Sequence, residues 1–388
     1  MPWKAVSPMD LRMELMSRLA AGEKPADLRR EYGISKKTLN KFRRRFEAKG
    51  IDGLADQSRA PKSIPHKTPP EVEAVILAER NLHPTWGPKK LKDVIEKRDK
   101  TTLPSVSTVG SVLVRHGVVV KRSKRPTFVA KPSRLREAVE PNDLWCIDYK
   151  GQFRLGDRSY CYPLTITDQV ARFILACEGM PAISDEEATE VCQDVFRTYG
   201  LPNAMRSDNG APFASVGLAG LTKLSVYWTR LSIELERIRP AHPEENGRHE
   251  RMHWTLKRET TRPARKNLLQ QQERFDEFVD EFNCQRPHEA LAMKRPAEVY
   301  RPSQRRLPAA LPELDYPMHD DAVRVGPRGY LRILGTEFYL TSALANEHVG
   351  IREEHDGTWV ITFGLIDLGV LRGNKFSALN QSAPMCPV

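Results

Sequence analysis

The stretch Leu144-Trp145-Cys146-Ile147-Asp148-Tyr149-Lys150-Gly151 places an acidic residue inside an apolar run that is typical of a β-strand. An unpaired carboxylate in such a strand is costly to bury, which favours a bound cation beside it. Two further acids have related settings, because Asp208 lies where a short apolar stretch breaks into a turn and Glu250 begins a run with helical periodicity. Hard divalent cations prefer such oxygen ligands, and a pair of them can support in-line displacement at phosphorus. The pattern therefore indicates nuclease or transferase chemistry.

Asp208 also has an ordinary interpretation, because it precedes Asn209-Gly210 and could be a simple turn former. For the third acid the sequence offers Glu244, Glu245 and Glu250 close together, with 35 residues between Asp208 and Glu244 and 41 between Asp208 and Glu250. Glu244 follows Pro243 in a loop, whereas Glu250 lies on the predicted helix.

Basic residues are concentrated at the N-terminal end of the 388-residue chain. The chain has 61 Lys and Arg against 50 Asp and Glu, a formal net charge of +11. Residues 1–136 hold 31 of the basic and 14 of the acidic residues, and the remainder holds 30 and 36. This asymmetry indicates a nucleic-acid-binding part joined to a near-neutral part. A solvated basic surface is the alternative, but the excess coincides with helix-turn-helix patterns.

Residues 1–52 are predicted to form a helix-turn-helix DNA-binding domain of three helices, with a tight turn at 32–35 and a basic third helix over 36–49. An ordinary three-helix bundle with a charged face is the alternative. A linker over 53–70 leads to a second helix-turn-helix or winged-helix-like domain at 71–122. A basic linker over 123–140 follows, which could track phosphates or be solvated.

From residue 141 the pattern changes to an α/β domain, predicted to extend to residue 300. β-rich runs are followed by a helix from Ser184, a strand at 204–207, a helix, a strand and the helix that begins at Gly247. A linker over 301–317 precedes short alternating strands over 318–372, which suggest a small β-barrel, and a tail over 373–388.

Several motifs, in this order, resemble the integrase-core transposases of bacterial insertion sequences, which are relatives of retroviral integrase. They are G-I-S-K-K-T (33–38), W-G-P-K-K-L (86–91), D-L-W-C-I-D-Y-K-G (143–151), R-S-D-N-G (206–210), H-P-E-E-N-G-R-H-E-R-M-H-W-T-L-K (242–257) and R-P-H-E-A-L (286–291). The resemblance implies an RNase H-like core in which Asp148, Asp208 and Glu250 hold two Mg²⁺ ions, with Mn²⁺ as a substitute. It favours Glu250 because the family's catalytic Glu comes three residues after the Gly of this motif, and the extra residues fit as an insertion in 213–230.

Other residues receive expected roles from their positions. Tyr149, Asn209 and Asn246 flank the acids and are expected to support them, whereas His249 and His253 could approach phosphates. Lys257 resembles the family's DNA-contacting lysine. The residues predicted to bind DNA are Lys36, Lys37, Lys41, Arg44, Arg45, Lys89, Lys90, Arg115, Lys121, Arg122 and Lys257.

The sequence therefore predicts a DNA transposase that binds terminal inverted repeats and then cleaves and transfers strands into target DNA as a homodimer or higher homo-oligomer. The alternatives are a domesticated, non-enzymatic DNA-binding regulator and an RNase H-type nuclease. The six cysteines form no C-x-x-C pair and none precedes Cys146, so we expect reduced, mostly buried thiols and no structural zinc. We expect no membrane association and a cytoplasmic, nucleoid-associated protein.

Overall fold

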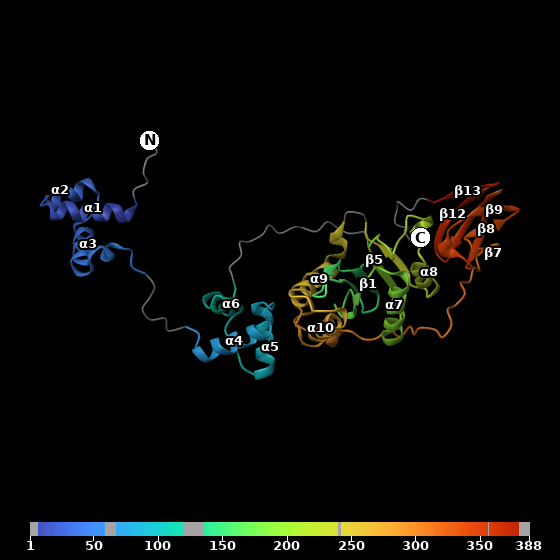
Figure 1. Cartoon of the computed structure of the whole chain (residues 1–388), viewed down its shortest axis with the longest axis horizontal. Helices are drawn as coiled ribbons and strands as arrows, with labels where there is room; N and C mark the ends of the chain where they lie inside the picture. The colour runs from blue at the N-terminus through green and yellow to red at the C-terminus, as the bar shows by residue number, and fades with distance from the viewer. Residues whose placement is uncertain (1–6, 59–66, 120–134, 240–241, 356, 380–388) are drawn as a thin grey trace. The chain divides into compact units, whose positions relative to one another are not determined.

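The computed structural model describes residues 7–58, 67–119, 135–239, 242–355 and 357–379. The chain divides into two compact units, Met1–Thr68 and Pro69–Val388, which are considered separately below. Figure 1 labels some of the helices and strands of each unit. None of the helices within the described ranges is long and apolar enough to cross a membrane.

The first unit consists of α1 (Pro8–Ala20), α2 (Pro25–Glu31), α3 (Lys36–Lys49) and the short 3₁₀ helix η1 (Gly50–Leu54). Gly33 has a φ of +61° in the turn before α3, and the Ser35 side chain accepts a hydrogen bond from the Thr38 amide to cap that helix. Leu28 and Leu54 are fully buried in the small core. The three predicted helices are confirmed, and the packing extends into the segment predicted as a linker.

The second unit begins with a further trihelical group, α4 (Pro70–Leu82), α5 (Pro88–Asp99) and α6 (Val106–Arg115). Its core surrounds Trp86 and Leu91, and Ser105 caps α6 by accepting the Thr108 amide. These helices lie in the segment predicted as the second helix-turn-helix or winged-helix-like domain. Much of the basic linker predicted over 123–140 lies outside the described residues, and so do Lys121 and Arg122, which precede it.

The central domain is built on a mixed sheet. Its strands are β1 (Leu144–Tyr149), β2 (Phe153–Arg154), β3 (Tyr160–Asp168), β4 (Ile174–Met180), β5 (Ala204–Ser207) and β6 (Glu234–Arg237). β3 pairs antiparallel with β1, β2 and β4, whereas β5 lies parallel to β1 and β6 lies parallel to β5. Across the sheet the order is β4-β3-β1-β5-β6, the arrangement expected for an RNase H-like core.

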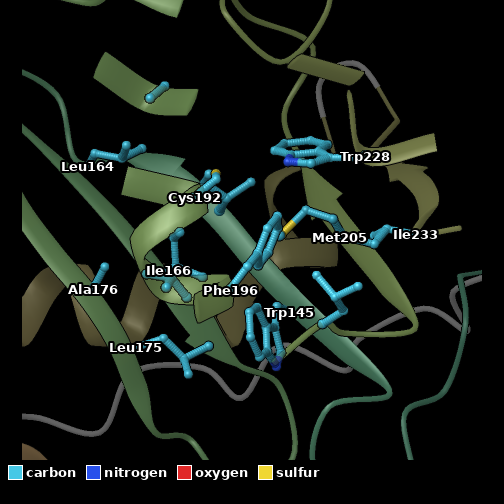
Figure 2. Packing of buried hydrophobic residues seen from close by; sticks show 14 of the residues in the cluster. Trp145, Leu164, Ile166, Leu175, Ala176, Cys192, Phe196, Met205, Trp228 and Ile233 are labelled. Atoms are coloured by element: carbon cyan, nitrogen blue, oxygen red, sulfur yellow. The ribbon is translucent and has the colours of Figure 1, made fainter. Parts of the chain in front are cut away.

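Helices cover both faces of this sheet. They are α7 (Asp185–Tyr199), α8 (Lys223–Arg230), α9 (Gly247–Thr260) and α10 (Leu268–Asp280), the last continued by the π-helical turn η4 (Glu281–Gln285). On one face Trp145 and Met205 pack against Phe196 of α7 and Trp228 of α8 (Figure 2). On the other face, α9 and α10 pack against side chains such as Cys177. Burial of apolar side chains on both faces fixes the strand ends that position the site.

Short helical turns and one further helix connect these elements. They are η2 (Leu218–Gly220), η3 (Pro243–Asn246), η5 (Glu289–Leu291), α11 (Pro296–Val299) and, in the C-terminal region, η6 (Ser342–Leu344).

The C-terminal region is an open sheet with a separate hairpin. The strands are β7 (Asp321–Arg324), β8 (Tyr330–Ile333), β9 (Thr336–Tyr339), β10 (His348–His355), β11 (Thr358–Phe363), β12 (Ile366–Arg372) and β13 (Lys375–Ala378). Five of them form the antiparallel order β13-β12-β11-β10-β7, and β8 pairs with β9. The predicted β-barrel is therefore wrong, because the described strands do not close. Strand β13 lies in the segment predicted as a tail.

This C-terminal sheet shares a core with the central domain. Leu221 and Val226, from the start of the α8 region, lie in one buried cluster with Leu331, Ile361 and Phe363. The guanidinium of Arg230 on α8 also reaches the carboxylate of Glu347 at 3.1 Å.

The cysteines within the described residues are free thiols. Cys146, Cys161, Cys177 and Cys192 are buried, as expected, whereas Cys284 is exposed. Burial raises the pKa of the Cys146 thiol to about 12.

Candidate active site

The sheet topology brings Asp148 and Asp208 to one edge. Cys146 on β1 is paired in register with Arg206 on β5, and the two aspartates each follow two residues later. Because parallel strands end at the same edge of a sheet, the two carboxylates lie beside each other. Glu250 is in the first turn of α9, where a carboxylate is stabilised by the positive end of the helix dipole.

The electrostatics indicate that Asp208 and Glu250 both lie near Asp148. The pKa of Asp148 is raised to about 7, first by burial and then by the negative charge of Asp208, with a smaller contribution from Glu250; Lys150 opposes the shift. Asp208 is partly exposed and accepts the Gly210 amide at 3.0 Å, and Glu250 is exposed. A half-buried group of like charges made of oxygen donors fits a hard divalent cation, which would relieve the repulsion.

The neighbouring Glu245 has another partner. Its buried carboxylate accepts hydrogen bonds from the backbone amide of Arg239 at 2.8 Å and from the Arg239 guanidinium at 2.6 Å. The Glu244 side chain lies outside the described residues. The choice of Glu250 over Glu244 stays a prediction.

Two histidines and two threonines form a hydrogen-bonded cluster behind Asp148. The Thr165 hydroxyl on β3 lies 2.8 Å from His249 Nε2, 2.7 Å from His253 Nε2 and 3.1 Å from the Asp148 main-chain oxygen. The Thr167 hydroxyl lies 2.7 Å from His249 Nδ1. This His–Thr cluster joins α9, which carries Glu250, to β3 and to β1, which carries Asp148.

Burial determines the state of these histidines. It lowers the pKa of His249 to about 3 and that of His253 well below its usual value, so both rings are neutral. His253 Nδ1 approaches Asp148 Oδ2 at 3.7 Å, and one ligand atom from each of Asp148, His249 and His253 lies within 4.8 Å of the others. The expectation that the histidines could approach phosphates is wrong, because both rings are buried. Their i, i+4 spacing on the apolar face of the helix was the available signal.

The residues that flank the acids have distinct surroundings. The Tyr149 ring lies 5.8 Å from the Phe213 ring, and burial raises the pKa of its hydroxyl to about 12. The Asn209 side-chain amide donates to the Ile238 carbonyl at 2.6 Å, which ties the Asp208 turn to the end of β6. Asn246 is buried just before α9. Their supporting roles stay predictions.

The predicted DNA-binding residues fall into several groups. In the first unit, Lys36, Lys37, Lys41 and Arg44 are exposed on α3, and Arg45 donates to Gln57 at 2.8 Å. In the second unit, Lys89 contacts Glu289 at 2.6 Å and Arg115 contacts Glu73 at 2.5 Å. Burial, reinforced by the charge of Arg286, lowers the pKa of Lys90 to about 7. Lys257 is exposed on α9.

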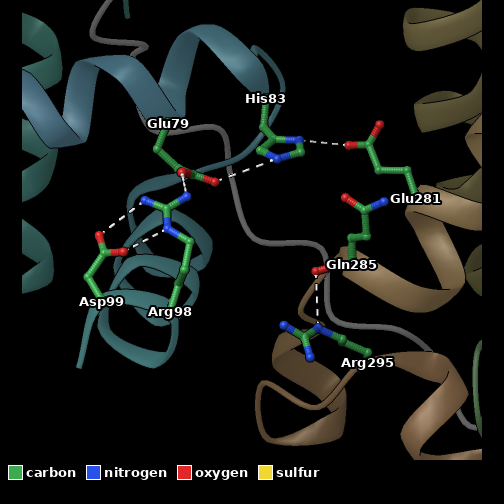
Figure 3. A network of polar contacts seen from close by, with 7 residues as sticks. All are labelled: Glu79, His83, Arg98, Asp99, Glu281, Gln285 and Arg295. Carbon is green, nitrogen blue, oxygen red and sulfur yellow. Dashed lines mark hydrogen bonds and ion pairs between the residues drawn. The ribbon is translucent and has the colours of Figure 1, made fainter. Parts of the chain in front are cut away.

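Sequence reasoning missed a polar network between the second trihelical group and the core helices. His83 lies 2.9 Å from Glu281 and 3.6 Å from Glu79 (Figure 3). Thr85 donates to Glu259 of α9, which also pairs with Arg286 at 2.8 Å. Apart from the i, i+4 contact of His83 with Glu79, these partners are far apart in sequence, so no local pattern could indicate them.

Comparison with protein-family models identifies four segments. Residues 11–62 match a helix-turn-helix domain and residues 38–113 match a homeodomain-like domain. Residues 138–243 and 231–296 match two models that are both described as integrase core domains. The matches agree with the order of helical and α/β regions described above.

Curated relatives are viral polyproteins. The chain is 25% identical over 196 residues to the Gag-Pol polyprotein of Baboon endogenous virus (strain M7), covering 50% of this chain and 11% of the relative. It is 30% identical over 138 residues to the Pro-Pol polyprotein of Simian foamy virus type 3 (strain LK3), covering 35% of this chain and 11% of the relative. The match thus spans about a tenth of the length of these relatives.

Solved structures with similarity include viral integrases. The HTLV-2 integrase catalytic core domain in complex with magnesium (trimeric form) is 14% identical, with a TM-score of 0.34, covering 42% of this chain and 99% of that one. A chain in the structure of the simian T-cell lymphotropic virus intasome in complex with PP2A regulatory subunit B56 gamma is 16% identical, with a TM-score of 0.38, covering 72% of this chain and 92% of that one. The family matches therefore assign residues 138–296 to the integrase core domain models, after helix-turn-helix and homeodomain-like matches in the N-terminal part of the chain.

Proposed function

We propose that the protein is the DNA transposase of an insertion sequence, which cleaves DNA at the ends of its element and joins those ends to target DNA. The observation that supports this most directly is the position of Asp148, Asp208 and Glu250 at the ends of two adjacent parallel strands and one helix, where the negative charges of Asp208 and Glu250 both act on Asp148. The integrase core matches support the reaction class.

Asp148, Asp208 and Glu250 would hold two Mg²⁺ ions, and Mn²⁺ would serve as a substitute for Mg²⁺. Bound there, the ions would activate a water and stabilise the attacking and leaving oxygens at phosphorus. In the first step the oxygen of that water bonds to phosphorus and the bond to the 3′-oxygen breaks, which leaves a 3′-hydroxyl. In the second step this hydroxyl attacks a phosphodiester of target DNA, and the target strand leaves with its own 3′-hydroxyl. The hydrogen-bonded cluster of Thr165, Thr167, His249 and His253 would keep β1, β3 and α9 in register during both steps.

The N-terminal helix-turn-helix domains would recognise the terminal inverted repeats. The exposed cations of α3 suit phosphate contacts, for which affinity falls with salt at a log–log slope of roughly −0.9 per neutralised phosphate. Joining two ends of one element requires at least two active sites, so a homodimer or larger homo-oligomer on DNA is proposed. A non-enzymatic regulator would also bind the repeats, but it would not cut them.

The test uses full-length protein and a duplex that ends in the inverted repeat flanking the coding sequence. Asp148→Asn, Asp208→Asn and Glu250→Gln should each abolish Mg²⁺- or Mn²⁺-dependent cleavage while duplex binding stays within about twofold. Asp194→Asn, an exposed acid on α7, is the matched control and should cut normally.

Near wild-type cutting by Glu250→Gln would transfer the role of the third acid to Glu244. Cutting by Asp148→Asn would refute the proposed chemistry. Specific repeat binding by the wild-type protein without any cutting in either metal would favour the regulator.

A further inference from the structure

Trp254 on α9 is the most exposed tryptophan within the described part of the second unit. Trp86, Trp145 and Trp228 are fully buried and Trp359 is partly buried, whereas Trp254 is 49% exposed. The guanidinium of Arg251 lies 5.6 Å from the centre of its ring, and that of Arg258 lies 5.5 Å from it. Both distances are typical of cation–π contacts. The ring is therefore held at the surface by two cations.

The exposed face of α9 combines this ring with positive charge. Glu250, Trp254 and Lys257 follow one another at helical spacing, and Arg251 and Arg258 lie one position further round. Within the described part of the chain, the ion pairs made by α9 side chains involve His253 and Glu259, so the three cations of this face are not neutralised by acids. An exposed row of unpaired cations suits a polyanion.

This face adjoins the carboxylate site. Lys150, which follows β1, has its pKa lowered first by burial and then by the charge of Lys257, while Asp148 and Glu250 act in the opposite direction. Lys257 and the two acids are thus close to the same lysine. Trp254 is one helical turn from Glu250, which places their Cβ atoms about 5–6 Å apart.

A tryptophan among cations offers more than a phosphate contact. Its ring presents a π face on which any nucleobase can stack, and such stacking tolerates different sequences. In a duplex, however, both faces of a base are covered by its neighbours. A side chain fixed on a helix can therefore stack only on a base that is unpaired or at an exposed end.

We propose that Trp254, flanked by Arg251 and Arg258, is a binding site for an unpaired nucleotide of the DNA next to the scissile phosphodiester. The inference rests on the proposed function for its substrate class and adds the requirement for a frayed or single-stranded segment beside the cleavage position. The arginines hold the indole in place and neutralise the flanking phosphates, and the ring stacks on the base.

The test is a binding assay with full-length protein in EDTA, so that it does not depend on cleavage. The probes are a blunt duplex and the same duplex with a short single-stranded tail that contains 2-aminopurine, whose fluorescence is quenched by stacking. Wild-type protein should bind the tailed duplex more tightly and quench the probe. Trp254→Ala should weaken tailed-duplex binding about tenfold and lose the quenching, with blunt-duplex binding unchanged within about twofold.

Two variants separate stacking from other effects. Trp254→Phe keeps an aromatic face and should retain part of both the affinity and the quenching. Tyr160→Ala is the matched control, because Tyr160 is also exposed, at 38%, and has the Arg154 guanidinium 5.1 Å from its ring; it should behave as wild type.

Equal loss of blunt and tailed binding in Trp254→Ala would overturn the proposal by making the residue a general duplex contact. Unchanged quenching would overturn it as well. Failure of the proposed catalysis would instead appear as an absence of cutting with Mg²⁺ while the quenching persists.

Discussion

Replacement of Thr165 by valine tests the His–Thr cluster behind Asp148. The Thr165 hydroxyl is fully buried and is the common partner of His249 Nε2, His253 Nε2 and the Asp148 carbonyl. Valine has nearly the same shape, so packing is preserved while every hydrogen bond of the hydroxyl is lost. The variant therefore isolates the polar contribution of the cluster.

The expected destabilisation follows from the groups that are left without partners. A buried polar atom without a hydrogen bond costs about 1–3 kcal/mol. Thr165→Val leaves one nitrogen on each histidine facing a methyl group, so we expect the free energy of unfolding to fall by roughly 3 kcal/mol. Thr167→Val removes only the partner of His249 Nδ1 and should cost about half as much, roughly 1–2 kcal/mol.

Chemical denaturation of the purified variants measures these differences. Thr198→Val is the control, because that hydroxyl is exposed on α7 and donates only to the Asp194 carbonyl of its own helix. Its effect should stay within about 0.5 kcal/mol. If Thr165→Val cost no more than Thr198→Val, the cluster would contribute nothing to stability and the reasoning would be refuted.

Other outcomes follow from charge and burial. His249 has a pKa of about 3 in the folded chain against 6.5 in the unfolded chain, so below pH 6.5 the unfolded chain binds an extra proton and the free energy of unfolding decreases as the pH decreases. His249→Asn should reduce this slope by about 1.4 kcal/mol per pH unit in denaturation curves measured between about pH 4 and 6. Arg206→Met removes the partner of Glu236 and should destabilise the fold by about 3–5 kcal/mol in the same assay, and a loss below about 1 kcal/mol would contradict the importance of this pair. Cys284 should be alkylated in the native protein well before Cys146, as read by peptide mass spectrometry; equal rates would contradict the buried position of Cys146.

Much of the central fold could be predicted because local patterns determine it. Apolar runs gave the strands, and the acid within 144–149 marked the strand that has the site at its end. Strand β1 ends at Tyr149, two residues before Gly151, whose φ of +83° does not fit an extended strand. The positions of Asp148 and Asp208 at one edge follow from the parallel pairing of β1 with β5, which the resemblance implied.

The remainder depends on tertiary contacts. The Thr165–His253 bond joins residues far apart in sequence, so the i, i+4 spacing of the histidines could indicate their burial but not their partners. Lys89 was predicted to bind DNA from its basic neighbourhood, but its contact with Glu289 is visible only in the folded chain. The C-terminal strands were expected to close into a barrel. Short alternating strands, however, are equally compatible with barrels and open sheets. Closure depends on pairing between the first and last strands, which alternation does not encode.

The buried cluster that joins Leu221 and Val226 to Leu331 and Phe363 has an evolutionary consequence. Recombination between related genes exchanges segments freely only where the joined parts do not depend on each other for solubility. Here, loss or replacement of the C-terminal sheet would leave apolar side chains near α8 in water. Homologous exchange at the 301–317 junction should therefore succeed only between genes in which the residues around α8 and the C-terminal strands have changed together. The two segments are expected to be inherited as a pair.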